Sequence, residues 1–389
     1  MRKSRLALWA VPAAAAVVVA GFSIFPNVAG ASPLLPAVTP QQLAANVATL
    51  KPVALSGQVQ VDTNIGLPDL GGLSGILGVT QSADLTNLLT GTTTIKVAED
   101  PKTGARAEID ASTSAYVAVA NLTTKDGWTY SSAQNTATHY VMPPQSSTAK
   151  APKPAEPTTT VPTPQSIGQQ FVDALTPSTN LSVARTDVVA GRDAYTLVLT
   201  PRSAGSLIAS VDIAVDAQTW LPLSVQVWSV QQTDKPALSI AFTSISYATP
   251  DASLFSFTPP QGTTVTTAGQ DAKPADTAKP AKTTAPEPTP TVVAGEGWSS
   301  VVKVTNVGDV ASALTDPTQI VKMLGGAASG SRHGQASSVS TLVGELAQQT
   351  PEGTVYSTNL VTLLVTPNGT VYAGAVPASA LEAAAKASK

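Results

Sequence analysis

The chain of 389 residues contains no cysteine. This absence excludes disulfide bonds, cysteine-ligated zinc and thiol catalysis. It also excludes the thioether-linked lipid anchor of bacterial lipoproteins, which needs a cysteine at the mature N-terminus. Charged residues are scarce as well, at 12% of the chain, and the formal net charge is −3. A nucleic-acid partner requires a basic surface, so this mildly acidic composition argues against one.

Catalytic side chains are equally scarce. His139 and His333 are the only histidines, and neither is accompanied by an oriented acid or an oxyanion motif. The chain has no nucleophile elbow, and no phosphate-binding or dinucleotide-binding loop follows a strand. The sequence therefore predicts a protein that is not an enzyme and that uses no cofactor or metal. His139 is expected to be solvated, or alternatively to make a pH-sensitive contact.

The first 31 residues have the pattern of an export signal. Three basic residues within positions 2–5 precede an apolar run over 6–25, and Ala29-Gly30-Ala31 fits the small-x-small cleavage pattern. Cleavage there starts the mature chain near Ser32. The apolar run is also long enough to span a bilayer, so an uncleaved signal anchor is the alternative. In both cases the body of the protein lies outside the cytoplasm, either secreted or anchored to the cell membrane.

Two segments rich in Pro, Thr, Ala and Lys divide the rest of the chain, and they bury too little apolar surface to fold alone. The sequence predicts a main domain over 32–262 with an insertion at 143–165, a linker over 263–295 and a small α+β module over 296–389. In that module we expect helices within 317–326, 338–350 and 377–389, and a hairpin with its turn at Asn368-Gly369.

The main domain is predicted to be mostly β-strand. Apolar and polar residues alternate with a period of two, which is typical of antiparallel strands with one buried and one solvated face. The strand-like segments cover residues 55–64, 92–100, 105–120, 128–141, 193–202, 208–230 and 237–248. Helical periodicity predicts three helices, at 39–50 with Thr39 as N-cap, at 82–91, and at 164–176 with Phe171 on its apolar stripe.

The second half of this domain contains four motifs: Gly191 before Tyr195, the Asp216-x-x-Thr219-x-x-Pro222 turn, the Phe255-x-Phe257 pair and Pro259-Pro260-x-Gly262. Through these motifs it resembles the LolA-like superfamily of outer-membrane lipoprotein carriers and lipoprotein-sorting proteins, which includes the RseB/MucB regulators. The hairpin at 126–142 is similar to a family region with the same aromatic spacing. The additional C-terminal segment resembles the LolA-like proteins of high-GC Gram-positive bacteria.

The resemblance implies an unclosed antiparallel β-barrel whose concave face is lidded by helices. Alternating apolar side chains on that face would form a dry slot for an acyl chain. The alternative for each aromatic is ordinary packing that seals the sheet. The residues expected to line the cavity or its lid are Trp128, Tyr130, Tyr140, Leu197, Leu199, Val211, Ile213, Val215, Val225, Val227, Phe242, Phe171, Leu67 and Leu70.

A Gly-rich apolar loop at 64–80 contains Leu67 and Leu70. Glycines give such a loop little fixed shape of its own. It is expected to be either a flap at the mouth of the cavity or a loop folded back on the sheet.

Two functions follow from the resemblance. The first is an extracytoplasmic carrier that binds the acyl chains of a lipid or lipoprotein without catalysis. The alternative is an RseB/MucB-like envelope-stress sensor, with a membrane protein such as an anti-sigma factor or a transporter as its partner. A structural wall-associated domain with a collapsed cavity is a third reading.

Overall fold

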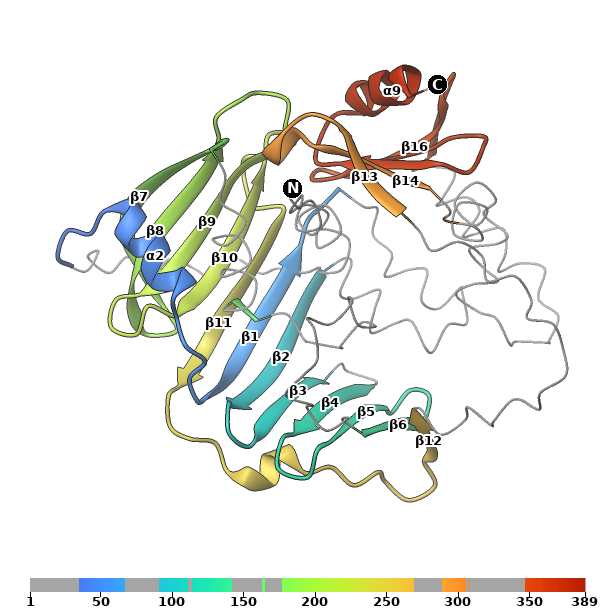
Figure 1. Cartoon of the computed structure of the whole chain (residues 1–389). Coiled ribbons are helices and arrows are strands. Elements are labelled where there is room, and N and C mark those ends of the chain that lie inside the picture. Colours follow the sequence, from blue (N-terminus) through green and yellow to red (C-terminus); the bar gives the residue numbers. More distant parts are fainter. Residues whose placement is uncertain are drawn as a thin grey trace, which may run out of the picture.

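The computed structural model describes residues 35–66, 91–110, 114–141, 163–164, 177–268, 289–305, 307 and 347–388. Within these residues the chain forms a 12-stranded sheet and a 6-stranded sheet (Figure 1). The first sheet is large, antiparallel and unclosed, as the sequence predicts, and helices are few.

The 12-stranded sheet has the order β12-β6-β5-β4-β3-β2-β1-β11-β10-β9-β8-β7. Its edge strands β12 and β7 do not pair with each other, so the sheet stays open. All neighbours are antiparallel except β12, which runs parallel to β6. The strands are β1 Leu55–Thr63, β2 Gly91–Asp100, β3 Gly104–Asp110, β4 Ala115–Asn121, β5 Asp126–Ser131, β6 Thr136–Val141, β7 Thr179–Val189, β8 Arg192–Pro201, β9 Ile208–Asp216, β10 Pro222–Ser229, β11 Leu238–Ser246 and β12 Thr264–Ala268.

The 6-stranded sheet has the order β13-β14-β18-β17-β16-β15. Helix α9, Ala378–Ala387, packs on it through Leu381, Ala384 and Ala385. The Asn368-Gly369 turn joins β17 to β18 with Gly369 at φ 78°, which confirms the predicted hairpin. The strands are β13 Thr289–Ala294, β14 Val301–Thr305, β15 Ala347–Thr350, β16 Gly353–Ser357, β17 Thr362–Val365 and β18 Val371–Gly374.

Helix α2, Pro40–Ala48, begins at a complete capping box. The Thr39 side chain accepts a hydrogen bond from the Gln42 backbone N–H, and the Gln42 side chain accepts one from the Thr39 backbone N–H. Pro40 fits the first turn because its missing N–H has no helical partner there. The helix predicted over 39–50 is therefore confirmed. It buries Leu43, Ala44 and Val47 against the first sheet.

The first sheet has two distinct faces. Residues directly opposite each other on paired strands share a face, so the register links Leu197 to Ile213, then to Val225 and Ile240. The row continues to Val61 on β1. These residues form one core cluster with Leu43 and Val47 of α2. We call the face that bears this row the inner face.

The opposite face, the outer face, is covered at β3 and β4 by the 3₁₀-turn η1, Ala252–Phe255, which lies outside the curve of the sheet in Figure 1. Phe255 is 1% exposed and packs over Gly104. A Cβ atom at Gly104 would lie 3.1 Å from Phe255 and 2.2 Å from the Ala120 carbonyl oxygen, so this close approach requires glycine.

The second sheet is fastened to one end of the first through the β16–β17 loop. Leu360 and Val361 belong to the core cluster of the first sheet and are at most 6% exposed. Asn359 donates from its backbone N–H to the Ile65 carbonyl at 2.7 Å, and its own carbonyl accepts from the Ser229 hydroxyl at 2.6 Å. The two sheets therefore share buried apolar surface and backbone hydrogen bonds.

Several boundaries differ from the expected ones. Strands β12 and β13 lie in the predicted linker 263–295, because each finds a sheet edge to pair with. The segment 105–120 is a β3–β4 hairpin, and residues 347–350 of the helix predicted at 338–350 form strand β15. Pairing with β16 supplies backbone partners that helical periodicity in the sequence does not reveal. Three predicted helices lie outside the described residues, except for one residue in each of two of them: 82–91, of which Gly91 begins β2, 164–176, of which only Pro164 is described, and 317–326.

Candidate functional site

Most of the aliphatic residues expected to line a cavity lie side by side on the inner face. They are the inward residues of β8, β9, β10 and β11, and each is at most 3% exposed. They pack with α2 and with one another in a single core cluster. They are Leu197, Leu199, Val211, Ile213, Val215, Val225, Val227 and Phe242. Their role in binding a ligand stays a prediction, since tight packing and ligand contact both use this face.

The inner face continues as an apolar surface beyond these strands. Val59 pairs with Ile95, Ile95 with Ile109, and Ile109 with Tyr116. Beside this row, Ala107 pairs with Ala118, and both are only half-buried. The inner face is thus densely packed near α2 and less completely covered over β3 and β4.

The aromatic hairpin has a different placement from the expected one. Trp128 pairs with Val119 and Tyr130 with Val117, and this register puts both rings on the outer face. There Phe257 lies 5.9 Å from the Trp128 ring and 5.6 Å from the Tyr130 ring, between centroids. Two aromatics expected as walls of the slot therefore contact a segment that crosses the other side of the sheet. The alternating direction of side chains along β5 decides this.

Tyr140 points to the face opposite Trp128, because it pairs with Gly127, and it is 42% exposed. Leu67, Leu70 and Phe171 lie outside the described residues. Among the residues that the structure describes, no three His, Asp or Glu side chains are close enough to hold a metal ion. The same residues include no helix that is long and apolar enough to cross a membrane.

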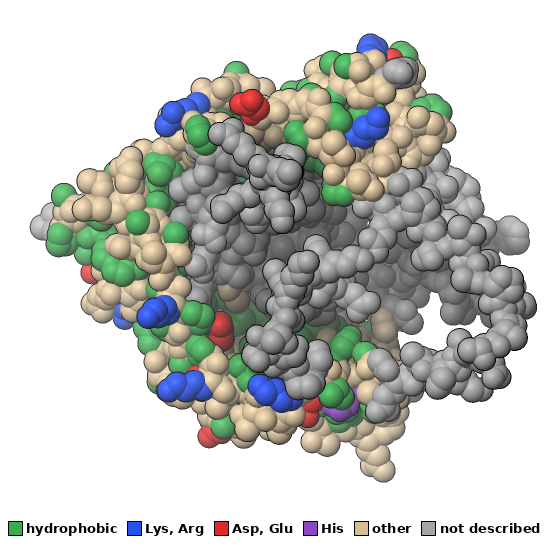
Figure 2. All heavy atoms as spheres, viewed as in Figure 1, with side chains coloured by type: hydrophobic (Ala, Val, Ile, Leu, Met, Phe, Trp, Pro, Cys, Tyr) green, Lys and Arg blue, Asp and Glu red, His purple; other side chains and the backbone are tan. Residues whose placement is uncertain are grey.

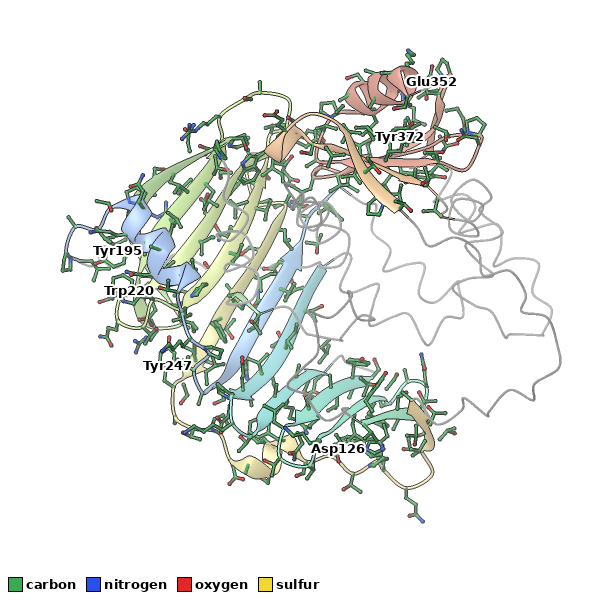
Figure 3. The ribbon with its side chains drawn as sticks, in the orientation of Figure 1. Asp126, Tyr195, Trp220, Tyr247, Glu352 and Tyr372 are labelled. Atoms are coloured by element: carbon green, nitrogen blue, oxygen red, sulfur yellow. The ribbon has the colours of Figure 1, made fainter. Side chains whose placement is uncertain are left out.

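A cavity of about 510 Å³ opens at the end of the sheet where β7 turns into β8 and β9 into β10. The sequence did not single out this site, because its lining comes from three separate segments. The lining comprises residues 35–38 and 191–193 together with Tyr195, Ala217, Gln218 and Trp220. Figure 3 places Tyr195, Trp220 and Tyr247 on this flank of the first sheet. Figure 2 shows hydrophobic side chains gathered at the same left-hand edge.

Two aromatic rings form the wall of this cavity. The Tyr195 and Trp220 rings are nearly parallel, at an interplanar angle of 13°, with centroids 6.0 Å apart. The Tyr195 hydroxyl donates to the Pro36 carbonyl at 2.9 Å, which holds the segment 35–38 against the sheet. Trp220 has φ 64°, a left-handed conformation that costs a bulky residue about 1–3 kcal/mol. Glycine or asparagine would occupy this turn position at lower cost.

A buried carboxylate holds the turn that carries Trp220. Asp216 is 0% exposed and accepts from Arg192 Nε at 2.6 Å and from the Tyr247 hydroxyl at 3.0 Å. It also accepts from the backbone N–H groups of Gln218 and Thr219. Burial acts to raise the pKa of Asp216, but these hydrogen bonds outweigh it, and the pKa lies below its usual value. The Asp216-x-x-Thr219-x-x-Pro222 motif is therefore the support of the cavity wall.

The charges around the cavity do not balance. Arg192 contributes one positive charge, which is directed at Asp216, and hydrogen bonding keeps Asp216 ionised despite its burial. Asp193 lines the cavity as a second carboxylate. One guanidinium against two carboxylates leaves one negative charge in this region. A ligand of this cavity is therefore expected to be neutral or cationic.

No family model and no curated protein matches the chain. Solved structures do. The MucA/MucB complex of Pseudomonas aeruginosa matches with 12% identity and a TM-score of 0.35, over 88% of this chain and 94% of that chain. A LolA superfamily protein from Nitrosomonas europaea matches with 11% identity and a TM-score of 0.21, over 57% of this chain and 99% of that chain.

An uncharacterized conserved protein from Thermus thermophilus also matches, with 12% identity and a TM-score of 0.30, over 58% of this chain and 98% of that chain. The LolA-like resemblance and its high-GC Gram-positive type stay predictions from the sequence motifs. Superpositions this loose assign neither a family to the chain nor a role to any individual residue.

Proposed function

We propose that this protein is an extracytoplasmic, non-catalytic carrier that binds the acyl chains of a lipid or lipoprotein on its inner face. The observation that carries the proposal is the continuity of that apolar face across an unclosed sheet, from Leu197 on β8 to Tyr116 on β4. An open sheet keeps one long edge accessible, so an elongated apolar ligand can enter without passing through a closed barrel wall.

The contact surface is placed over β3 and β4, where Ala107 and Ala118 are half-buried. Near α2 the side chains already fill the space, as the 0% exposure of Leu43 and Ile213 indicates. An acyl chain of about 16 methylenes contributes roughly 13 kcal/mol when fully buried, before ordering costs are subtracted. Partial burial of such a chain is sufficient for micromolar binding.

The proposal is tested by mass spectrometry of the purified protein and by titration with a fluorescent fatty acid. Ala118→Trp places a large ring on the inner face, and we expect it to weaken binding at least about tenfold. Thr124→Trp puts the same ring in an exposed turn and serves as the matched control. Absence of co-purified lipid together with equal affinity of both variants would contradict the proposal.

A second candidate function is the envelope sensor, and the joint between the two sheets favours it. Leu360 and Val361 of the second sheet lie in the core of the first, so a ligand that shifts this core also shifts the second sheet. The partner would be a membrane protein such as an anti-sigma factor. Hydrogen exchange decides between the two functions: a sensor changes protection in β16 and β17 when fatty acid binds, whereas a simple carrier does not.

A further inference from the structure

The cavity beside Tyr195 and Trp220 is a separate feature from the acyl-binding surface over β3 and β4. It lies at the start of β8 and the end of β9, and its volume of about 510 Å³ is that of a small-molecule site. Its lining includes the half-buried Trp220, on which the buried Tyr195 ring stacks, together with the polar residues Arg192, Asp193 and Gln218. We propose that this cavity is a binding site for a sugar ring, either neutral or bearing an amino group.

The aromatic wall suits the apolar side of a pyranose ring. The face of an aromatic ring carries negative charge density, which attracts the weakly polarised C–H groups of a sugar. Tyr195 is fixed in place by its hydrogen bond to the Pro36 carbonyl at 2.9 Å, and Trp220 stacks beside it. The wall is therefore ordered before a ligand arrives, so binding does not have to immobilise it.

The backbone conformation of Trp220 supports a role in ligand binding for its side chain. A tryptophan at φ 64° is unfavourable, and a network centred on the buried Asp216 holds the turn in this shape. Glycine would adopt this left-handed backbone conformation without the steric cost that tryptophan has there. Trp220 packs on the edge of the core cluster and stacks on Tyr195, and it also lines the cavity with its half-buried side chain, which leaves part of the residue available to a ligand.

The polar rim matches hydroxyl groups better than anionic groups. Gln218 and Asp193 are exposed: the Gln218 amide oxygen accepts from Arg192 Nη2 at 3.2 Å, its NH2 group can donate to a hydroxyl, and the Asp193 carboxylate can accept from one. Arg192 is already engaged by Asp216, with Nε–Oδ2 at 2.6 Å, so it is not available as a dedicated phosphate clamp. The excess carboxylate repels a phosphorylated sugar and attracts an amino sugar.

The same sugar ring can come from a free saccharide or from the head group of a glycolipid, whose acyl chain would extend to the inner face. The test therefore uses methyl glucoside, glucosamine, glucose 6-phosphate and octyl glucoside below its micelle concentration. Saturation-transfer NMR and tryptophan fluorescence report binding to the full-length protein. A fluorescent fatty acid is titrated in parallel as the probe of the proposed carrier function.

Trp220→Gly removes the ring while suiting the left-handed backbone, and Trp228→Phe removes a tryptophan outside the cavity as the matched control. We expect Trp220→Gly to weaken methyl glucoside binding about tenfold and to leave fatty-acid binding unchanged. Asp193→Asn should abolish the preference for glucosamine over methyl glucoside. Tighter binding of octyl glucoside than of methyl glucoside identifies a glycolipid source, and equal binding identifies a free sugar.

Three results would overturn the proposal. They are the absence of saturation transfer to methyl glucoside and octyl glucoside, unchanged sugar affinity in Trp220→Gly, and binding of glucose 6-phosphate as tight as that of methyl glucoside. Loss of fatty-acid binding alone would instead contradict the carrier function and leave the sugar site intact, so the two failures are distinguishable.

Discussion

The Arg192 guanidinium donates two hydrogen bonds to the Asp216 carboxylate, with Nε–Oδ2 at 2.6 Å and Nη2–Oδ1 at 3.2 Å. The pair joins the start of β8 to the end of β9, and Asp216 additionally anchors the turn that presents Trp220. The side chain of Asp216 is 1% exposed and that of Arg192 is 27% exposed. An ion pair this buried depends on complete hydrogen bonding, which the surrounding backbone and Tyr247 supply.

Asp216→Asn should lower the free energy of unfolding by about 2–3 kcal/mol, because Arg192 loses its charged partner while the amide oxygen still accepts from the turn. Urea denaturation at pH 7 measures this loss. The folded pKa of Asp216 lies below the usual 3.8, so its stabilisation is present above about pH 4 and is lost as pH falls through the folded pKa. Wild type and Asp216→Asn should therefore converge in stability in strong acid.

Asp187→Asn is the control for this prediction. Asp187 forms an ion pair with Arg185 at 3.6 Å, and both exposed side chains belong to β7, the strand next to β8. Loss of this ion pair should lower the free energy of unfolding by at most about 0.5 kcal/mol. A cost for Asp216→Asn as small as that of the control would contradict the role assigned to the buried pair.

Asp62→Asn should stabilise the protein at pH 8. Asp62 is 1% exposed, and burial, opposed only by hydrogen bonds from Thr92 and Gln60, raises its pKa from 3.8 to about 7. The folded state then holds a proton that the unfolded state releases, so stability falls as pH rises from about 4 to 7 and is level above that. The expected gain in Asp62→Asn at pH 8 is on the order of 3 kcal/mol.

Urea denaturation of wild type and Asp62→Asn at pH 5, 7 and 8 measures this effect. Asp110→Asn provides the comparison: it removes an exposed ion pair with Lys96 on the surface of β3, which should lower stability by at most about 1 kcal/mol. Parallel curves for wild type and Asp62→Asn across this range would mean that Asp62 is ionised normally in the folded protein.

Asn359→Ala should loosen the joint between the two sheets. The Asn359 side chain donates to the Asn64 carbonyl at 3.2 Å and to the Gln232 side chain at 2.9 Å. Its removal should cost about 2 kcal/mol and increase hydrogen exchange in β17 more than in β9. Gln348→Ala, on the exposed part of β15, should leave both rates unchanged. Uniform acceleration across both sheets would show that the joint and the cores unfold as one unit.

Trp128→Ala should act on stability and not on acyl binding. The ring contacts Phe257 and stacks on His139 at 4.3 Å between centroids, all on the outer face. We expect a loss of about 2–3 kcal/mol, with fatty-acid affinity within about twofold of wild type. Phe257→Ala and the double variant complete a cycle in which the two losses should not add. A large loss of fatty-acid affinity in a folded Trp128→Ala protein would show that Trp128 belongs to the acyl-binding surface.

Much of the first sheet was predictable because its strands alternate clearly. The segments at 55–64, 92–100 and 193–202 became β1, β2 and β8 with boundaries shifted by at most one residue. Strand β7 was missed because it is an edge strand with a single fully buried residue, and its apolar residues do not alternate regularly along its length. Strands β12 and β13 were missed because Pro- and Thr-rich composition resembles a linker whether or not a sheet edge is nearby.

The candidate site was less predictable. Alternation identifies which residues of one strand share a face, but not which face of the sheet curves inward. Trp128 and Tyr130 were therefore grouped with Leu197 and Ile213, although the register separates them. The cavity at Trp220 combines segments more than 150 residues apart, and its left-handed backbone leaves no mark in the sequence.

The mostly β architecture, the capped helix at Thr39 and the absence of cysteine chemistry follow from the order of the amino acids, because periodicity, capping and composition are local or additive properties. Folding of the whole chain is what places Phe257 over Trp128, brings Leu360 into the core of the first sheet, and sets Tyr195 against Trp220 beside Pro36. Those contacts depend on strand register and on the curvature of the sheet. Both arise from the summed packing of the whole chain, which no short stretch of residues encodes.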